Sequence, residues 1–197
     1  MYRRPVLPRL GSSKLITTWI LLTIAASFVA VIDGGWLATW ASLVPSRILR
    51  GEVWRLVTWP LIEPGAISLV LTCFTIYRFG GDLAHRWGDR RLRSFILQLV
   101  LVAAVGTSLV TLLLGVDLYG RLGGLAVCDV LVIAWARQFP QQPLTLYGMV
   151  TLAGQQLVNI TVATAVVFAF FYGPLSSAPE LIACFAAAAY PRGLLAR

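Results

Sequence analysis

Long apolar runs alternate with short polar or basic segments along this chain. The first run, Leu15 to Ile32, contains no charged residue. A helix of about 20 mostly apolar residues can cross the hydrocarbon core of a membrane. The pattern therefore predicts six membrane-spanning helices, of which the last is short, at about 15–32, 66–83, 94–114, 122–136, 155–172 and 179–190.

The segment 33–64 has a different pattern. It mixes Trp, Leu and Arg, and it is interrupted by Pro45, Pro60 and Pro64. None of its apolar stretches is long enough to span a membrane. Trp-rich amphipathic pieces of this kind lie in the membrane interface, so we expect an interfacial loop after the first span.

The composition agrees with a membrane protein. Hydrophobic residues make up 58% of the 197 residues and charged residues 12%. Soluble domains contain about 45–50% apolar and about 25% charged residues, which argues against an ordinary soluble enzyme. We predict an all-α, polytopic integral membrane protein, with a six-helix domain over 15–190.

The net charge of +8 comes from short basic clusters between the apolar runs. Six spans place both termini on one side, and twelve of the 16 cations fall on that side. The positive-inside rule then predicts that the ends, residues 1–14 and 191–197, are cytoplasmic. One cluster, formed by Arg86, Arg90, Arg91 and Arg93, is typical of a topology signal that also attracts anionic lipids. No aromatic residues alternate with its arginines, so nucleic acid is not an expected partner.

Residue usage gives a prediction about the source. Fifteen of the 16 cations are Arg, and Asn occurs once, at Asn159. This usage favours a GC-rich bacterial genome and hence a bacterial inner membrane.

Several kinds of chemistry have no support in the sequence. The cysteines Cys73, Cys128 and Cys184 lack the spacing of a disulfide framework or a metal site. There is no phosphate-binding glycine loop and no zinc-binding histidine motif. We expect no cofactor, metal or small-molecule substrate. The lack of an internal repeat also argues against a transporter.

Residues 50–95 contain a Trp54-Arg55 pair followed by Thr58, and then Gly80, Gly81, Asp82, Gly88 and Arg90-Arg91. This order of residues resembles the rhomboid superfamily. Rhomboids carry a Trp-Arg pair shortly before span two, which corresponds to Trp54 and Arg55, with Thr58 following. Span two of rhomboids is followed by glycines, an acidic residue and a basic cluster, which correspond here to Gly80 or Gly81, Asp82, Gly88 and Arg90-Arg91.

Within this superfamily the chain is most similar to the derlins, which are rhomboid pseudoproteases. The similar segments are Ile76-Tyr77-Arg78-Phe79, Trp135-Ala136-Arg137-Gln138-Phe139-Pro140 and Tyr147-Gly148. The resemblance implies a protein that binds or handles other membrane proteins.

The catalytic positions of a rhomboid protease are occupied by other residues. The serine of its Gly-x-Ser-Gly motif falls on Leu122 or Gly123, and span six has no histidine. The only histidine, His85, lies in the predicted cytoplasmic loop. The His-Asn pair of span two falls on Ser68 and Thr72, and the loop histidine falls on Glu63. Without nucleophile and base we expect no protease activity. Three glycines remain in this region, Gly120, Gly123 and Gly124, and they would then allow helices to pack closely.

Polar residues within the predicted spans are further candidates. Asp129 lies in the middle of span four. It either makes hydrogen bonds inside the bundle, to Ser68, Thr72 or Asn159, or forms part of a polar groove that binds a partner. Gln155, Gln156 and Asn159 form one polar face of span five. They either bond neighbouring helices or line a cavity for a substrate segment.

The Trp54-Arg55 pair also has two interpretations. Arg55 either ties the interfacial loop to backbone carbonyl groups, which we favour, or contacts a client protein. Overall we expect an inactive rhomboid-like protein that acts as an accessory subunit of a membrane complex or as a client adaptor. The alternative is an unorthodox intramembrane hydrolase, in which Ser68 or Thr72 acts with Asp129 or Glu63 as base.

Overall fold

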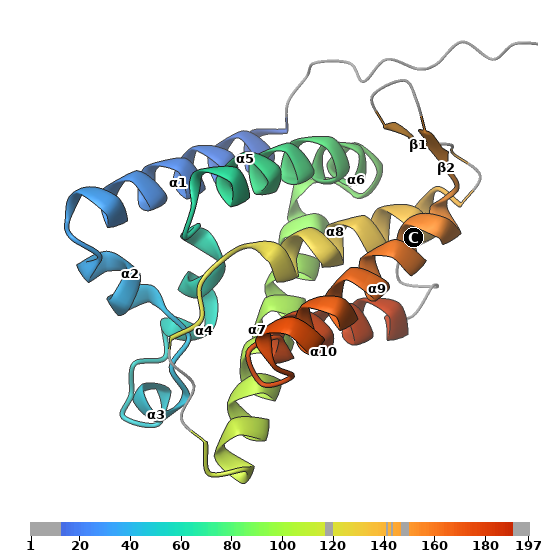
Figure 1. Ribbon diagram of the computed structural model, residues 1–197. Helices are drawn as coiled ribbons and strands as arrows, with labels where there is room; N and C mark the ends of the chain where they lie inside the picture. The colour runs from blue at the N-terminus through green and yellow to red at the C-terminus, as the bar shows by residue number, and fades with distance from the viewer. Residues whose placement is uncertain (1–12, 117–119, 141, 143, 147–149, 191–197) are drawn as a thin grey trace, which may run out of the picture.

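The computed structural model describes residues 13–116, 120–140, 142, 144–146 and 150–190, and the chain in these segments is mainly helical (Figure 1). The N-terminal half contains α1 (Lys14–Ile32), α2 (Trp36–Ala41), α3 (Pro45–Ile48), α4 (Arg55–Thr58), the 3₁₀ helix η1 (Trp59–Leu61), α5 (Ala66–Thr75), the π-helical turn η2 (Ile76–Gly80) and α6 (Gly81–Trp87). The remainder contains α7 (Asp89–Leu113), α8 (Leu125–Gln138), strands β1 (Leu144–Leu146) and β2 (Val150–Leu152), α9 (Gly154–Tyr172) and α10 (Ala178–Ala189).

Four helices of the described chain are long and apolar enough to cross a membrane. They are α1, the continuous helix Ala66–Trp87, α7 and α9. The segments expected to form spans four and six are the helices α8, with 14 residues, and α10, with 12 residues. At 1.5 Å per residue they extend about 21 and about 18 Å, less than the hydrocarbon core of about 30 Å. The chain is therefore a polytopic helical membrane protein, in which two central helices are short.

A β-hairpin between α8 and α9 corrects the all-α prediction. β1 and β2 pair antiparallel, with Leu144 opposite Leu152 and Leu146 opposite Val150. The hairpin lies between the predicted spans 122–136 and 155–172, where no strand was expected. Its two Leu-Thr-Leu-type triplets alternate apolar and hydroxyl residues, which suits short strands. The derlin-like pair Tyr147-Gly148 falls outside the described residues, as do the predicted cytoplasmic segments 1–12 and 191–197.

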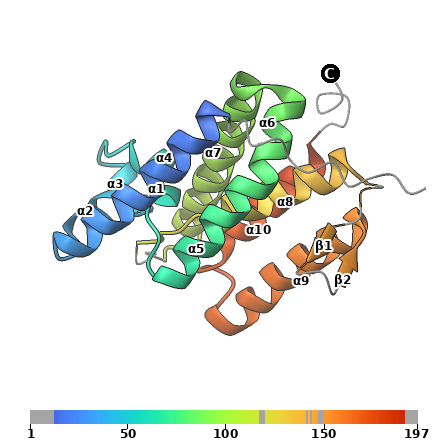
Figure 2. The ribbon, with the colours of Figure 1, turned by 90° about the horizontal axis from the view of Figure 1, so that it is seen from above.

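The short helix α8 is the centre of the bundle. It contacts α5, η2, α7, α9 and α10, and most of its residues from Ala126 to Ala136 are buried (Figures 1 and 2). The alanine-rich α10 packs against α7 and α8 through small side chains such as Ala183 and Ala187. Small residues let helices approach closely, which is how helices pack where lipid offers no hydrophobic driving force.

Polar contacts fix the two ends of the bundle. At one end, Ser13 Oγ donates to Asp89 Oδ1 at 2.6 Å, so α1 and α7 begin side by side. At the other end, Leu43 and Arg121 form a backbone bridge, and Arg121 pairs with Glu180 of α10. The segment 33–64, which was predicted to lie in the membrane interface and is called the interfacial segment below, therefore lies at the second end of the bundle (Figure 1).

Candidate functional site

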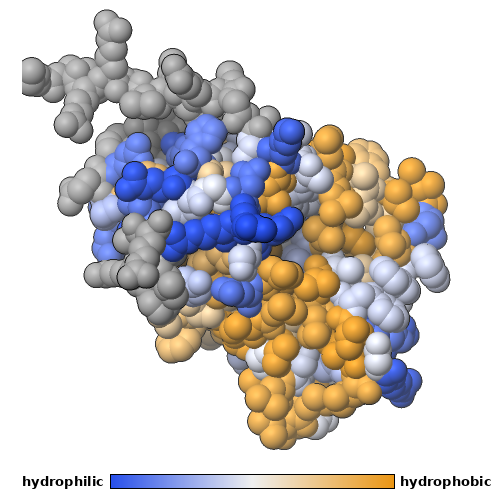
Figure 3. Space-filling model, turned by 180° about the vertical axis from the view of Figure 1, so that it is seen from behind, coloured by the Kyte–Doolittle hydropathy of each residue, from blue (hydrophilic) through white to orange (hydrophobic). Residues whose placement is uncertain are grey.

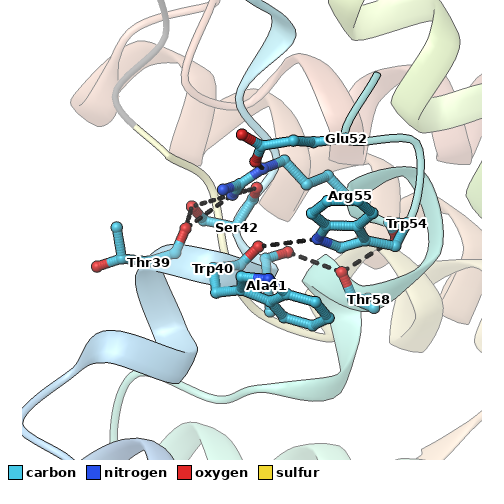
Figure 4. Close-up of polar contacts among 8 residues, drawn as sticks. All are labelled: Thr39, Trp40, Ala41, Ser42, Glu52, Trp54, Arg55 and Thr58. Atoms are coloured by element: carbon cyan, nitrogen blue, oxygen red, sulfur yellow. Dashed lines mark hydrogen bonds and ion pairs between the residues drawn. The ribbon is translucent and has the colours of Figure 1, made fainter. Parts of the chain in front are cut away.

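Arg55 is the centre of the interfacial segment, and its side chain is fully buried. Its Nε donates to Glu52 Oε2 at 2.6 Å. Its Nη1 donates to the backbone oxygens of Thr39 and Ser42, both at 2.7 Å (Figure 4). The guanidinium thus ties α2 and the turn after it to α4, which is the role through backbone carbonyl groups that we favoured.

The neighbours of Arg55 complete this tie. Thr58 Oγ1 donates to the backbone oxygen of Ala41 at 3.0 Å. The Trp54 indole stacks on Trp40, with ring centroids 5.2 Å apart, and its Nε1 donates to the backbone oxygen of Trp40 at 3.4 Å (Figure 4). The Trp-Arg-x-x-Thr pattern therefore holds the interfacial segment together from its inner side.

Glu63 joins the interfacial segment to α5 and α8. Its Oε1 accepts hydrogen bonds from Thr72 Oγ1 and from the backbone N–H of Gly124, each at 2.7 Å. Its backbone N–H donates to Ser27 Oγ of α1 at 2.9 Å. Both Glu63 and Thr72 are buried. One carboxylate therefore holds together three segments that are up to 61 residues apart.

Gly124 leaves no room for a side chain at this junction. A Cβ atom there would lie 2.8 Å from Glu63 Oε1 and 2.9 Å from Thr72 Cγ2. Gly123, at a φ of +118°, donates its N–H to the backbone oxygen of Trp59 at 3.1 Å. Cys128, one turn into α8, contacts Thr72 Oγ1 at 3.6 Å. The glycines thus allow the start of α8 to pack directly on the interfacial segment.

The other positions aligned with protease residues are dispersed. Ser68 Oγ donates to the backbone oxygen of Gly65, within the first turn of α5. Leu122 packs against Ala30, Ala41 and Ile62. Gly120 lies against Ser42. His85 is exposed in the last turn of α6, at the far end of the helix 66–87 from Thr72. Only Thr72, Gly123 and Gly124 meet at one place, and the residue that joins them is Glu63.

Asp129 faces α10 rather than Thr72. It lies beside Cys184 and Glu180 of α10. Glu180 is buried and accepts from Arg121 Nη2 at 2.6 Å through Oε1. The contacts that we expected from Asp129 to Ser68, Thr72 or Asn159 are therefore wrong. The sequence did not reveal Glu180, although an acidic residue in an otherwise apolar helix was a usable signal.

The polar residues of α9 bond within their own helix. Gln155 Nε2 donates to Asn159 Oδ1 at 3.2 Å, and Gln156 Oε1 accepts from the N–H of Ala153. All three side chains are exposed. The expected hydrogen bonds to neighbouring helices are not found among the contacts of the described segments. The polar face of α9 is therefore exposed in the part of the chain that the structure describes.

Two of the derlin-like segments meet at the π-helical turn η2. Asp82 Oδ2 accepts from Trp135 Nε1 at 2.8 Å and pairs with Arg78, whose guanidinium lies over the Trp135 ring. Phe79 packs edge-on against the same ring. Arg137 Nη2 donates to the backbone oxygen of Tyr190 at the end of α10. These motif residues hold η2, α6, α8 and the end of α10 together, at the end opposite Glu63.

The basic cluster lies at this same end. Arg86, Arg90 and Arg93 are exposed, and Arg91 is half-buried. Figure 3 shows hydrophilic side chains gathered at one end of the molecule beside a broad hydrophobic area. Within the described ranges, no group of three His, Cys, Asp or Glu side chains could hold a metal ion.

Comparison with known proteins gave two findings. Residues 14–192 match a family described as eukaryotic integral membrane proteins, DUF1751. A stretch of 135 residues is 29% identical to Derlin-1 of Arabidopsis thaliana; it covers 64% of this chain and 47% of the plant protein. The chain thus spans about half the length of this curated relative. The eukaryotic description of the family stands against the bacterial source that we predicted from residue usage.

Proposed function

From the premise that this chain belongs to the DUF1751 family of derlin-like, rhomboid-like membrane proteins, we propose that it is a pseudoprotease that binds other membrane-spanning proteins. It acts either as an accessory subunit of a membrane complex or as an adaptor for clients. In this proposal the chain crosses the membrane six times, with α8 and α10 as its short central spans and both termini in the cytoplasm. The bilayer around two such short helices is thinned, which favours contact with other membrane segments.

The non-catalytic part of the proposal rests on the Glu63 junction, where Glu63 Oε1 accepts hydrogen bonds from Thr72 Oγ1 and from the N–H of Gly124. The start of α8, where the rhomboid nucleophile would lie, presents Gly124, and its N–H is already bonded to Glu63 Oε1. Thr72, at a position of the oxyanion-stabilising pair, donates to the same oxygen. Donors that a protease would aim at a developing oxyanion are thus used to hold the fold together.

The binding part of the proposal is supported by α9. This helix is mostly exposed, and its N-terminal half presents the Gln155–Asn159 pair outwards. Side-chain amides in a membrane helix have few partners in lipid, and they bond well to polar groups of another helix. We therefore assign the α9 face with Gln155 and Asn159 as the contact surface for partner helices.

The experiment is purification of the tagged chain from its native membrane in mild detergent, followed by quantitative mass spectrometry. The double variant Gln155→Leu/Asn159→Leu should recover several-fold less of each specific partner than the wild type. The matched control is Thr17→Val in α1, which removes an exposed hydroxyl bonded only to its own helix end. Partners at fixed stoichiometry indicate a subunit, and many partners at variable amounts indicate an adaptor. Equal recovery from all three chains would contradict the assignment of α9.

A second function has one observation in its favour. Thr72 Oγ1 lies 2.7 Å from Glu63 Oε1, which is the distance between a hydroxyl nucleophile and a general base. Ser68 and Asp129 do not form such a pair, since Ser68 bonds its own helix turn and Asp129 faces α10. A fluorophosphonate probe tests the hydrolase directly. Labelling that disappears in Thr72→Val, but persists in Ser68→Ala, would establish it; we expect no labelling of any of the three chains.

A further inference from the structure

A groove of about 310 Å³ lies between α1 and α7. One wall is a stripe of α1 with helical spacing over residues 15–22, including Leu15, Trp19 and Leu22. The other wall has the same spacing on α7 and includes Arg93, Leu97 and Val100. Val57, Pro60 and Leu61, which follow Arg55 in the chain, form the floor of the groove. Because Ser13 Oγ bonds Asp89 at the start of the two helices, both walls begin at the same end.

The charged and the apolar residues of the groove occupy different parts of its length. Nearly all of its lining is apolar, and Arg93 is its only charged residue. Arg93 lies four residues into α7, about 6 Å along the helix from its start, and directly precedes the predicted span 94–114. The groove then continues for about 10 Å along α7 towards Val100. A ligand that fits it must be anionic at one end and apolar beyond it.

Among the residues that the structure describes, no carboxylate forms an ion pair with Arg93. Its neighbours, Arg90 and Arg91 at the same end of α7 and Arg86 in α6, are also cations. The nearest acidic residue along the helix, Asp89, accepts from Ser13 Oγ and from the N–H of Leu15. Asp82 pairs with Arg78. The guanidinium at the mouth of the groove is therefore left for an external anion.

We propose that this groove is a binding site for one anionic phospholipid, whose acyl chain lies between α1 and α7 and whose phosphate contacts Arg93. The site goes beyond the proposed function and does not depend on it. The arginine at one end of the groove and the apolar lining beyond it match the charged headgroup and the acyl chain of such a lipid. A single extended acyl chain is thin enough to enter.

The test uses Trp19, which lines the groove, as a reporter. The protein is reconstituted in phosphatidylcholine vesicles that contain increasing fractions of phosphatidylglycerol with dibrominated acyl chains, or of equally brominated phosphatidylcholine. Bromine quenches tryptophan fluorescence on contact, and subtraction of the Trp19→Phe signal isolates Trp19. We expect half-maximal quenching of Trp19 at an about fivefold lower fraction of the anionic lipid, which is the preference that one arginine at the surface confers.

Three variants test whether the preference for the anionic lipid depends on the arginine that lines the groove. Arg93→Gln should bring the two quenching curves together, and Arg93→Lys should keep them apart. The matched control is Arg90→Gln, an exposed arginine of the same helix end that does not line the groove. Equal curves for the two lipids in the wild type would overturn the proposal. So would an equal loss of preference in Arg90→Gln and Arg93→Gln, since that result would indicate a general surface charge. Unfolding of Arg93→Gln would not affect the Arg93→Lys and Arg90→Gln comparison.

Discussion

The Glu63 junction and the N-terminal half of α9 both contain polar side chains, but these side chains find their hydrogen-bond partners in different places. At the junction, each polar group bonds a different segment: Glu63 receives Thr72 of α5 and Gly124 at the start of α8. On α9, Gln155 bonds Asn159 one turn away on the same helix. The first set is buried and the second is exposed.

This difference separates structural from interaction roles for polar residues. A buried acceptor with donors from distant segments stabilises the fold, since loss of either partner leaves an unpaired polar group in an apolar interior. An exposed pair that is bonded only within its own helix contributes little to the fold. Such a pair can exchange its hydrogen bonds for those of another molecule. The same contrast holds between Arg55, which is buried and bonded to three groups, and Arg93, which is exposed at a groove.

The largest expected effect is that of Glu63→Ala. It leaves the Thr72 hydroxyl and the Gly124 N–H buried without their acceptor, at about 1–3 kcal/mol each, so the free energy of unfolding should fall by about 2–6 kcal/mol. Titration with sodium dodecyl sulfate in detergent micelles measures it. Glu63→Gln keeps an acceptor oxygen and should lose less than half as much. Equal free energies of unfolding for Glu63→Ala and Glu63→Gln would show that the acceptor oxygen of Glu63 does not stabilise the junction.

Arg55→Ala should have the next largest effect. It removes charge-assisted hydrogen bonds to two backbone oxygens and leaves them buried, so we expect a loss of about 3 kcal/mol of unfolding free energy. The same titration applies, with Arg50→Ala as the control, since Arg50 is an exposed arginine of the same segment. A similar small loss in both variants would show that burial of Arg55 does not matter to stability.

Gly124→Ala should cost somewhat less. Its Cβ would lie 2.8 Å from Glu63 Oε1, and overpacking of this kind costs about 1–3 kcal/mol. The control is Gly81→Ala, because a Cβ at Gly81 meets nothing within 4 Å and alanine is the better helix former. We predict a lower midpoint of thermal unfolding for the first variant and no decrease for the second. A decrease of equal size in both would argue against a crowded junction.

The smallest expected effect on stability is that of Gln155→Leu/Asn159→Leu. Because these side chains are exposed and bonded only to each other, the free energy of unfolding should change by no more than about 0.5 kcal/mol. The measurement is again the detergent titration. A loss of 2 kcal/mol or more would mean that the pair stabilises the fold, and it would remove the contrast with Glu63.

The strongest local patterns in the sequence were sufficient to place the long helices. The uncharged run from Leu15 to Ile32 coincides with α1, and the runs around 94–114 and 155–172 coincide with α7 and α9. The Trp54-Arg55 pair was also interpretable, since a buried arginine in an apolar segment must find acceptors nearby. These features depend on neighbours within about 20 residues along the chain.

Features that depend on distant segments could not be predicted. The contact of Glu63 with Gly124 joins residues 61 positions apart, and nothing local to either residue indicates it. Asp129 was placed correctly within an apolar helix, but a 100° step around the helix decides whether it faces Thr72 or Cys184. The hairpin at 144–152 was missed because two triplets are too short to distinguish a strand from a helix by periodicity.

Site-specific photocrosslinking on α9 tests the central claim most directly. A photoreactive amino acid replaces Ile160, which is 47% exposed beside Asn159, or Leu21 on α1, which is 62% exposed. After irradiation in the native membrane, the account predicts discrete protein adducts from position 160 and only lipid or no adducts from position 21. Absence of protein adducts at position 160, or the same adducts from both positions, would contradict a binding surface on α9.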